Sequence, residues 1–207
     1  MFYQLPQKNI ILASASTTRQ KMMADVGLKV QAVPAHVDED SLKHAAQAEA
    51  MSGLDAATLI AEMKAQKISA LYPDAFVIGS DQLLTQGDDW FSKPASLDEA
   101  KATLKALSGQ THLLVTAAVV YENGKRLWHH AESPKISIRS LSDQDIDDYL
   151  HILGEAYAYT PGVYMMEHIG AQIISKIDGC PYAVLGLPLL QLLAFLRQHG
   201  LSLTQPK

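Results

Sequence analysis

The chain has 207 residues, 48% of them hydrophobic, and its 22 acidic and 17 basic side chains give a net charge of −5. This length and apolar content are typical of a globular protein that needs no disulfides, and the one cysteine, Cys180, cannot form an internal one. The acidic balance argues against non-specific nucleic-acid binding, which needs a basic face. It leaves room for a small cationic pocket that holds one anion.

The chain opens with MFYQLPQKNI, which has neither a basic segment nor a long apolar one, so we expect no secretory leader. Its longest apolar run, AVLGLPLLQLLAFL, is interrupted by Gly186, Pro188 and Gln191. This run falls short of the roughly 18 apolar residues of a membrane span. We therefore expect a cytoplasmic protein with no membrane partner.

The first predicted elements are a buried strand over residues 8–13 and a helix over residues 19–26. Ser16 is suited to cap the start of this helix and Gly27 its end. Alternating hydrophobicity then predicts a strand over residues 28–33.

Two helices are expected next. One begins at the acidic residues 38–40 and ends at Gly53, and the other is capped by Asp55 and ends before Pro73. The apolar stripe of the second helix leaves Lys64 on the exposed side.

Residues 75–86 predict a strand that is broken in its middle at Gly79-Ser80-Asp81. Residues 96–109 predict a helix with a capping box from Ser96 to Glu99. Asn123-Gly124 is the strongest short hairpin signal and predicts long antiparallel strands on either side.

The last predicted elements are a helix from residue 142, a strand over 170–179 and a closing helix over 182–199. The closing helix is expected to be kinked at Pro188 or to start there. The alternation of elements predicts an α/β fold with a long, twisted, mixed sheet.

Four features are hard to explain by packing alone. Ser14, Ser16, Thr17 and Thr18 lie before Arg19 at a predicted helix start. Backbone N–H groups, hydroxyls and a guanidinium together can bind an anion. A capped helix with a solvated arginine explains the same residues.

The second and third features are acidic. Residues 38–40 can supply oxygen ligands to Mg²⁺, or they can be the negative first turn of a helix. Asp81 directly follows an apolar strand segment, where a carboxylate is costly unless it is solvated or functional.

The fourth feature is a pair of lysines, Lys64 and Lys93, the second fixed by the following Pro94. Most lysines are solvated charges, so neither is specific by itself. The sequence has no phosphate-binding Gly-rich loop, no Cys/His metal spacing and no nucleophile elbow.

Taken in chain order, these pieces resemble the Maf family of nucleoside triphosphate pyrophosphatases over residues 8–199. The matching segments are Ser14–Arg19, Asp38-Glu39, AEMKA at 61–65, Gly79-Ser80-Asp81, Lys93-Pro94, LSGQTHLLVTAAVV from residue 107, PGVYMMEHIGAQII from residue 161 and GLPL at 186–189. Each motif is weak, but eight motifs in the right order form a specific pattern.

The resemblance implies a single domain over residues 1–207, with helices flanking the mixed sheet and two lobes around a cleft. It implies metal-dependent attack of water on the α-phosphate of a nucleoside triphosphate, which gives a nucleoside monophosphate and pyrophosphate. The implied catalytic residues are Asp81, Glu39, Lys64 and Lys93, with Glu39 and Asp81 as ligands of Mg²⁺ or Mn²⁺. Asp81 would accept the proton of water, and a homodimer is a further expectation.

The resemblance also implies that Ser14, Ser16, Thr18, Arg19, Gln82 and Glu167 bind the substrate. The sequence departs from the family at several of these positions: Thr17 and Thr18 replace a Pro-Arg pair, Gln82 replaces a threonine and Glu167 replaces a glutamine. The resemblance therefore predicts the type of reaction better than it predicts which nucleobase the substrate carries. Two rivals stay open, a nucleotide-binding regulator of septum formation without turnover and a degenerate scaffold.

Overall fold

The structure is a computed structural model that describes residues 2–4 and 8–204. The residues that led us to expect no leader, 1–10, lie partly outside this range. The chain divides into two compact units, each described here by itself. Unit 1 comprises Met1–Gln82, Thr116–Glu132 and Gly186–Lys207, and unit 2 comprises Leu83–Val115 and Ser133–Leu185.

The strands form one eight-stranded sheet of order β3-β2-β4-β6-β8-β9, with β5 paired to β4 and β7 to β6, and a separate pair of β1 and β10. Their bounds are β1 Phe2–Gln4, β2 Ile10–Leu12, β3 Gln31–Ala32, β4 Phe76–Gln86, β5 Asp89–Phe91, β6 Thr111–Glu122, β7 Lys125–Glu132, β8 Lys135–Ile138, β9 Ile174–Asp178 and β10 Ser202–Thr204. Strand β2 is parallel to β3 and β4, whereas the β6–β7 and β6–β8 pairs are antiparallel. The prediction of a mixed sheet is confirmed.

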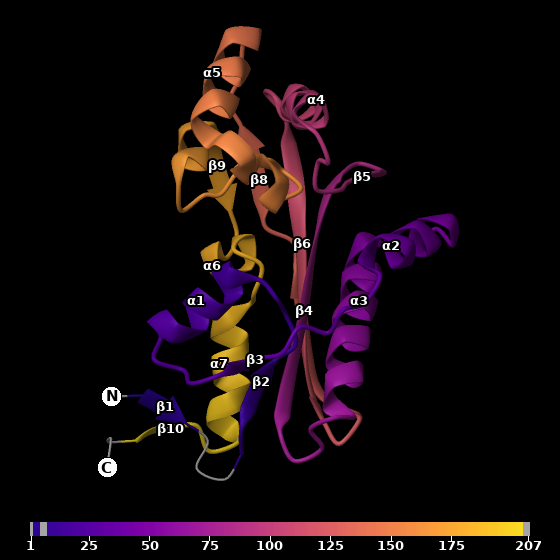
Figure 1. Cartoon of the computed structure of the whole chain (residues 1–207), viewed down its shortest axis with the longest axis vertical. Helices are drawn as coiled ribbons and strands as arrows, with labels where there is room; N and C mark the ends of the chain where they lie inside the picture. Colours follow the sequence, from indigo (N-terminus) through magenta and orange to yellow (C-terminus); the bar gives the residue numbers. More distant parts are fainter. Residues whose placement is uncertain (1, 5–7, 205–207) are drawn as a thin grey trace. The chain divides into compact units, whose positions relative to one another are not determined.

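The helices of unit 1 are α1 (Thr17–Asp25), α2 (Glu39–Ala48), α3 (Gly53–Ser69) and α7 (Leu189–Gln198). Figure 1 shows α3 running alongside β4. The unit buries the strand residues Ile11, Leu12 and Ile78 almost completely. An apolar strand packed in this way matches the unbroken apolar sequence that predicted it.

Unit 2 contains α4 (Leu97–Leu107), α5 (Asp143–Leu153), α6 (Pro181–Val184) and two 3₁₀ helices at Gly154–Tyr159 and Ile169–Gln172. It has an apolar core of its own. This core includes Leu84, Leu104, Leu107, Ile136, Ile146, Tyr149, Val163, Tyr164 and Ile173.

Several local predictions are confirmed. Ser16 caps α1 and accepts a hydrogen bond from the backbone of Arg19, and Asn123-Gly124 joins β6 to β7 with both residues at positive φ. Pro188 is the residue before α7, so the closing segment is two helices rather than one kinked helix.

Other local predictions are wrong. Strand β4 continues through Gly79-Ser80-Asp81 without a break, because the glycine serves a close approach described below and not a turn. Helix α3 is capped by Ser52, whose hydroxyl accepts from the backbone of Asp55. Lys64 is only 5% exposed and not on a solvated face, since the small residues around it let the helix lie against the strand.

Two further bounds and one capping interaction differ. Helix α2 ends at Ala48, ahead of Ala50 at positive φ, and the predicted strand over 28–33 is reduced to Gln31–Ala32. At α4 the Ser96 hydroxyl caps the helix, but the Glu99 carboxylate accepts from the backbone of Ala95, so only half of the capping box forms.

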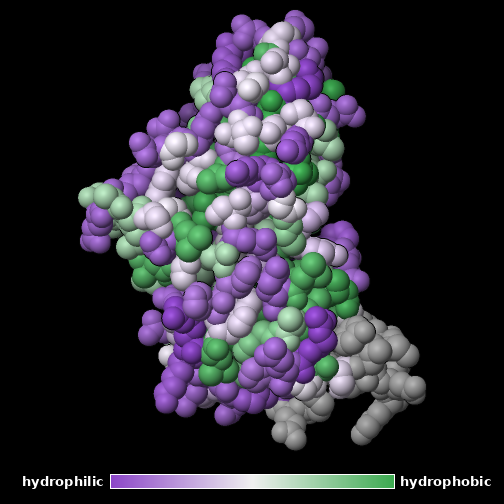
Figure 2. Space-filling model, turned by 180° about the vertical axis from the view of Figure 1, so that it is seen from behind, coloured by the Kyte–Doolittle hydropathy of each residue, from purple (hydrophilic) through white to green (hydrophobic). Residues whose placement is uncertain are grey.

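The described part of the chain has no helix that is both long and apolar enough to cross a membrane. Figure 2 shows one face on which hydrophilic side chains predominate, with smaller hydrophobic patches among them. The single domain over residues 1–207 and the cleft between two lobes stay predictions.

Candidate active site

The hydroxyl-rich turn of unit 1 connects β2 to α1. The Ser16 side chain caps α1, and the Ser14 hydroxyl accepts from the backbone N–H of Ser16 at 3.1 Å. Thr18 lies in the first turn of the helix and is half-buried. The turn thus presents hydroxyl groups at a helix N-terminus, where backbone N–H groups favour an anion.

Arg19 is buried and its guanidinium donates hydrogen bonds to backbone and side-chain oxygens of the protein. Its Nε donates to the backbone oxygen of Gly186 at 2.7 Å, and its Nη1 donates to the backbone oxygen of Ser80 at 3.0 Å and to the Ser14 hydroxyl at 3.3 Å. Burial lowers the pKa of the guanidinium, and the negative charges of Asp81 and Glu39 partly offset this. An arginine nevertheless stays charged, so Arg19 provides a fixed positive charge and joins three segments of unit 1.

Gly79 explains how α3 reaches the site. A Cβ atom at this position would lie 2.1 Å from the backbone oxygen of Ala61 and 2.9 Å from the Cβ of Ala65. No side chain fits there, so helix and strand approach each other directly. This approach brings Lys64, between those two alanines, to Asp81, two residues after the glycine.

Lys64 forms the centre of the ionic group. Its Nζ lies 2.7 Å from Asp81 Oδ1 and 2.8 Å from Glu39 Oε1. Lys64 and Asp81 are 5% and 3% exposed, whereas the Glu39 side chain is 42% exposed. Buried ions are tolerated only when they are paired and hydrogen-bonded, and this pairing lets unit 1 bury both charges.

One oxygen of this group has no partner among the described residues. Asp81 Oδ1 accepts from Lys64, but Oδ2 is buried and accepts no hydrogen bond from residues 2–4 or 8–204. Buried polar atoms are rarely left in this state unless they await a ligand, a water or a proton. Asp81 therefore has one oxygen that Lys64 holds in place and one that no described residue engages.

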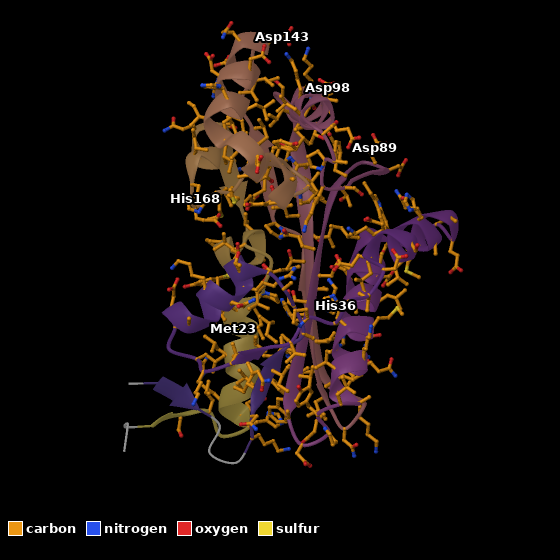
Figure 3. The ribbon with its side chains drawn as sticks, viewed as in Figure 1. Met23, His36, Asp89, Asp98, Asp143 and His168 are labelled. Atoms are coloured by element: carbon orange, nitrogen blue, oxygen red, sulfur yellow. The ribbon has the colours of Figure 1, made fainter. Side chains whose placement is uncertain are left out.

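Glu39 begins α2, next to its N-cap Asp38. Partial burial raises the pKa of Glu39, but the positive charges of Lys64, Lys43 and Arg19 together hold the pKa below its ordinary value. The loop before α2 is tied to α3, because Lys67 Nζ donates at 2.9 Å to the backbone oxygen of His36, which Figure 3 labels. Glu39 is thus held ionised beside Lys64.

Asp38 and Asp40 are not part of this group. Asp38 accepts from the backbone and hydroxyl of Ser41, and both hydrogen bonds lower its pKa. Asp40 is exposed in the first turn of α2. For these two residues the helix-start interpretation holds, whereas Glu39 turns toward the lysine.

A hard cation fits the donors that are present. Asp81 and Glu39 offer carboxylate oxygens, and Asp81 Oδ2 is unpartnered. Within residues 8–202 no three His, Cys, Asp or Glu side chains converge as a metal cage. Mg²⁺ commonly binds through one or two carboxylates and takes its remaining ligands from water and substrate phosphates.

The other predicted site residues fall in both units. Gln82 belongs to unit 1, where its Nε2 donates to the Thr116 hydroxyl at 2.8 Å. Lys93 and Glu167 belong to unit 2, where both side chains are exposed. The structure brings together Arg19, Ser14, Glu39, Lys64 and Asp81, and the membership of Lys93 and Glu167 in the same site stays a prediction.

Sequence reasoning missed the roles of Ser80 and Gly186. The Ser80 hydroxyl lies 2.8 Å from the backbone oxygen of Ala117 and 2.9 Å from that of Gly186, which also accepts from Arg19. Gly186 has φ +94°, and a Cβ there would lie 3.3 Å from the guanidinium. The GLPL motif gave a signal for Gly186, but its long-range contact with Arg19 has no local signature.

In this α/β fold a lysine is buried between two carboxylates, beside a helix start lined with hydroxyl groups. Such an arrangement suits an enzyme that acts on an anionic substrate. Comparison with known proteins makes this specific. The profile of the family described as Maf-like protein matches residues 9–199, so the chain belongs to the Maf family.

Curated relatives cover almost the same residues. The chain is 44% identical to a nucleoside triphosphate pyrophosphatase of Granulibacter bethesdensis, with 92% of this chain and 96% of the relative covered. It is 42% identical to a protein of the same name from Rhodospirillum rubrum, with 94% and 96% covered. It is also 42% identical to a 7-methyl-GTP pyrophosphatase of Mesorhizobium japonicum, with 93% and 97% covered.

Proposed function

We propose that this chain hydrolyses a nucleoside triphosphate to a nucleoside monophosphate and pyrophosphate. Relatives at 40–44% identity that carry the name nucleoside triphosphate pyrophosphatase support the reaction. The observation that carries the mechanism is the unpartnered, buried Oδ2 of Asp81. Among the described residues it is the carboxylate oxygen of the ionic group that is buried without a hydrogen-bond partner, which suits it to accept a proton.

In the proposed reaction a water oxygen bonds to the α-phosphorus while the bond between that phosphorus and the bridging oxygen to the β-phosphate breaks. Pyrophosphate leaves with the electron pair. Asp81 Oδ2 accepts the proton of the water, and Lys64 holds the other oxygen of the same carboxylate in place. General bases of this kind typically contribute about 10²–10⁴-fold to the rate.

The positive charges would offset the negative charge of the phosphates. Lys64 has three N–H donors, of which Asp81 and Glu39 use two. Arg19 adds a second positive charge in unit 1, and the α1 N-terminus with Ser14 and Ser16 adds N–H and hydroxyl donors. Phosphoryl transfer depends mostly on such positioning and charge neutralisation.

We further propose that Mg²⁺ or Mn²⁺ is required and that Glu39 or Asp81 would hold it. Because Lys64 occupies Asp81 Oδ1, Glu39 would be the ligand when Asp81 Oδ2 acts as the base. When bound, the ion would neutralise phosphate charge and lower the pKa of a water. The hard oxygen donors support this choice over a soft-ligand metal. Addition of EDTA should abolish pyrophosphate release, and either ion should restore it, whereas full turnover in the chelator would overturn the requirement.

A nucleotide-binding regulator without turnover is the second candidate. Two carboxylates beside a phosphate site speak against it, because binding alone does not need them. The deciding experiment incubates the purified chain with the common nucleoside triphosphates and 7-methyl-GTP, and measures pyrophosphate release together with nucleotide-dependent thermal stabilisation. Pyrophosphate release supports the enzyme, and thermal stabilisation without release supports the regulator. If neither release nor stabilisation is observed, the result supports a degenerate scaffold.

Thr18, Gln82 and Glu167 are proposed to help select the nucleobase of the substrate. An ionised Glu167 only accepts hydrogen bonds, so it would favour a base edge that offers N–H donors. Lys93 is proposed to contact phosphate. A cytoplasmic location, a homodimer and a link to septum formation stay predictions.

A further inference from the structure

The segment that carries Glu167 has an unusual backbone. Val163 is completely buried at φ +61°, a conformation that a β-branched residue rarely adopts. Such strain persists only where the surroundings over-determine it, and it clusters at functional sites. The segment over residues 160–170, which we call the Val163 loop, therefore needs an explanation in terms of what holds it.

Backbone contacts close the Val163 loop at both ends. The Tyr149 hydroxyl donates to the backbone oxygen of Val163 at 2.9 Å, and the Thr160 hydroxyl donates to that of Tyr164 at 2.9 Å. A Cβ at Gly170 would lie 2.5 Å from the backbone oxygen of Met165, so the loop returns directly onto its own chain. The loop is fixed before and after Glu167.

A further restraint is a buried pair. His112 Nε2 and the Tyr164 hydroxyl lie 2.5 Å apart, and the two residues are 1% and 6% exposed. Within the loop the Tyr164 ring packs directly on Gly162, where a Cβ would lie 2.4 Å from the ring. Burial lowers the pKa of His112 to about 4, so the imidazole is neutral at neutral pH. The pair is thus a neutral hydrogen bond from β6 to the loop.

The part of the loop between these restraints is polar and exposed. Glu167 and His168 lie in a turn closed by the hydrogen bond from the backbone of His168 to that of Met165 at 3.0 Å, and both side chains are exposed. Figure 3 labels His168 beside this turn. The restraints therefore fix the backbone on both sides of an exposed carboxylate.

We propose that His112 and Tyr164 are positioning residues that fix the Val163 loop and thereby set the substrate discrimination exerted through Glu167. This inference rests on the proposed function. Neither residue needs to touch the substrate. Their hydrogen bond selects one conformation of the loop, and a displacement of about 1 Å at a positioning group can cost roughly 10²-fold.

The test is a double-mutant cycle of Tyr164→Phe and Glu167→Gln. It measures the kcat/KM ratio for the best and second-best substrates among 7-methyl-GTP, GTP and UTP. Tyr164→Phe should change this ratio at least about fivefold, within the range that misplaced positioning groups produce. In the Glu167→Gln background the same change should have an effect of less than about twofold, as expected for residues acting in one chain of contacts.

Two further variants separate positioning from stability. Ile146→Val shortens a residue of the same core and should lower stability without moving the ratio. His112→Gln keeps a group that can bond to the Tyr164 hydroxyl and should retain the wild-type ratio better than His112→Phe. An equal ratio in wild type, Tyr164→Phe and Ile146→Val would overturn the inference, as would an undiminished effect in the Glu167→Gln background.

Amide hydrogen exchange of residues 163–170 provides a readout that does not depend on turnover. Tyr164→Phe should accelerate exchange there more than Ile146→Val does, and equal exchange would overturn the positioning role. If wild type releases no pyrophosphate from any nucleotide, the proposed function fails while the exchange measurement still decides whether the pair holds the loop.

Discussion

The two units bury polar groups in different ways. Among the described residues the buried charged side chains, Arg19, Lys64 and Asp81, all belong to unit 1, whereas unit 2 buries the neutral polar residues Thr85 and His112. Unit 1 pairs Lys64 with Asp81 and holds Arg19 through backbone oxygens, so its buried charges serve electrostatics. It also buries neutral polar residues, namely Ser14, Ser69, Ser80 and Thr116. Unit 2 uses a neutral hydrogen bond and a strained backbone, so its polar interior serves shape. This difference predicts that substitutions of buried polar residues in the two units change stability, its pH dependence and catalysis in different ways.

Removal of the central charge of unit 1 should have the largest effect. Lys64→Met leaves the Asp81 carboxylate buried without its counter-ion, and breaking a buried pair in this way costs about 3–5 kcal/mol. Urea denaturation of wild type and Lys64→Met measures this loss in the free energy of unfolding. Lys21→Met removes an exposed lysine of the same unit and should change stability by less than about 0.5 kcal/mol; similar losses in the two variants would contradict the comparison.

The pH dependence of unit 2 should come from His112. Burial lowers its pKa from 6.5 to about 4, so below pH 6.5 the unfolded chain binds a proton that the folded chain does not. Stability is complete above about pH 6.5 and is lost as the pH falls toward about 4, by about 3 kcal/mol in total.

The measurement is the free energy of unfolding of wild type and His112→Gln between pH 7 and pH 4.5. The variant lacks the titrating group, so its stability should fall less over this range. Parallel curves for the two proteins would exclude His112 as the source.

Asp81→Asn tests the chemistry of unit 1. It should lower kcat at least about 100-fold, because asparagine cannot accept the proton. Asp89→Asn, an exposed change in unit 2 that Figure 3 locates, should leave kcat unchanged. Near-normal turnover by a folded Asp81→Asn protein would move the role of base to Glu39.

The structure also revises the expected stability of Asp81→Asn. From the sequence, Asp81 and Glu39 look like two repelling carboxylates, whose reduction to one would leave the melting temperature unchanged or raise it. Lys64 lies between them, so the substitution weakens an ion pair and should lower the melting temperature.

The smallest expected effect concerns Glu39. Its pKa is below the ordinary 4.5 in the folded chain, so its stabilisation is present above pH 4.5 and is lost as the pH falls through the lowered value. Because the side chain is 42% exposed, the difference in stability between wild type and Glu39→Gln should be at most about 1 kcal/mol. Denaturation at pH 7 and pH 3 checks it, and a gap that widens in acid would contradict the sign.

Local signals predicted local structure well. The Ser16 cap and the Asn123-Gly124 hairpin follow from neighbouring residues, and both are confirmed. Family motifs also named the residues of the ionic group. Burial of Lys64 could not be predicted, because it depends on Gly79, fifteen positions away in the chain, and on the absence of a Cβ there.

The strain at Val163 is equally invisible in the sequence. Valine predicts ordinary extended backbone, and only the surrounding hydrogen bonds from Tyr149 and Thr160 reveal why it departs from it. Glycine would be the expected residue at such a φ. Contacts between distant segments decide both cases, and a local pattern carries no information about them.

The backbone oxygen of Gly186 has a consequence for biosynthesis. It accepts hydrogen bonds from Arg19 and Ser80, which are made early, but it begins the last segment of unit 1. All of unit 2 leaves the ribosome before this oxygen does. A nascent chain that has reached Leu185 already contains Lys64, Asp81 and Glu39, yet its buried arginine lacks this acceptor. The hydrogen bonds from Arg19 and Ser80 to this oxygen can therefore form only late in translation, after the residues that would select the substrate have been made.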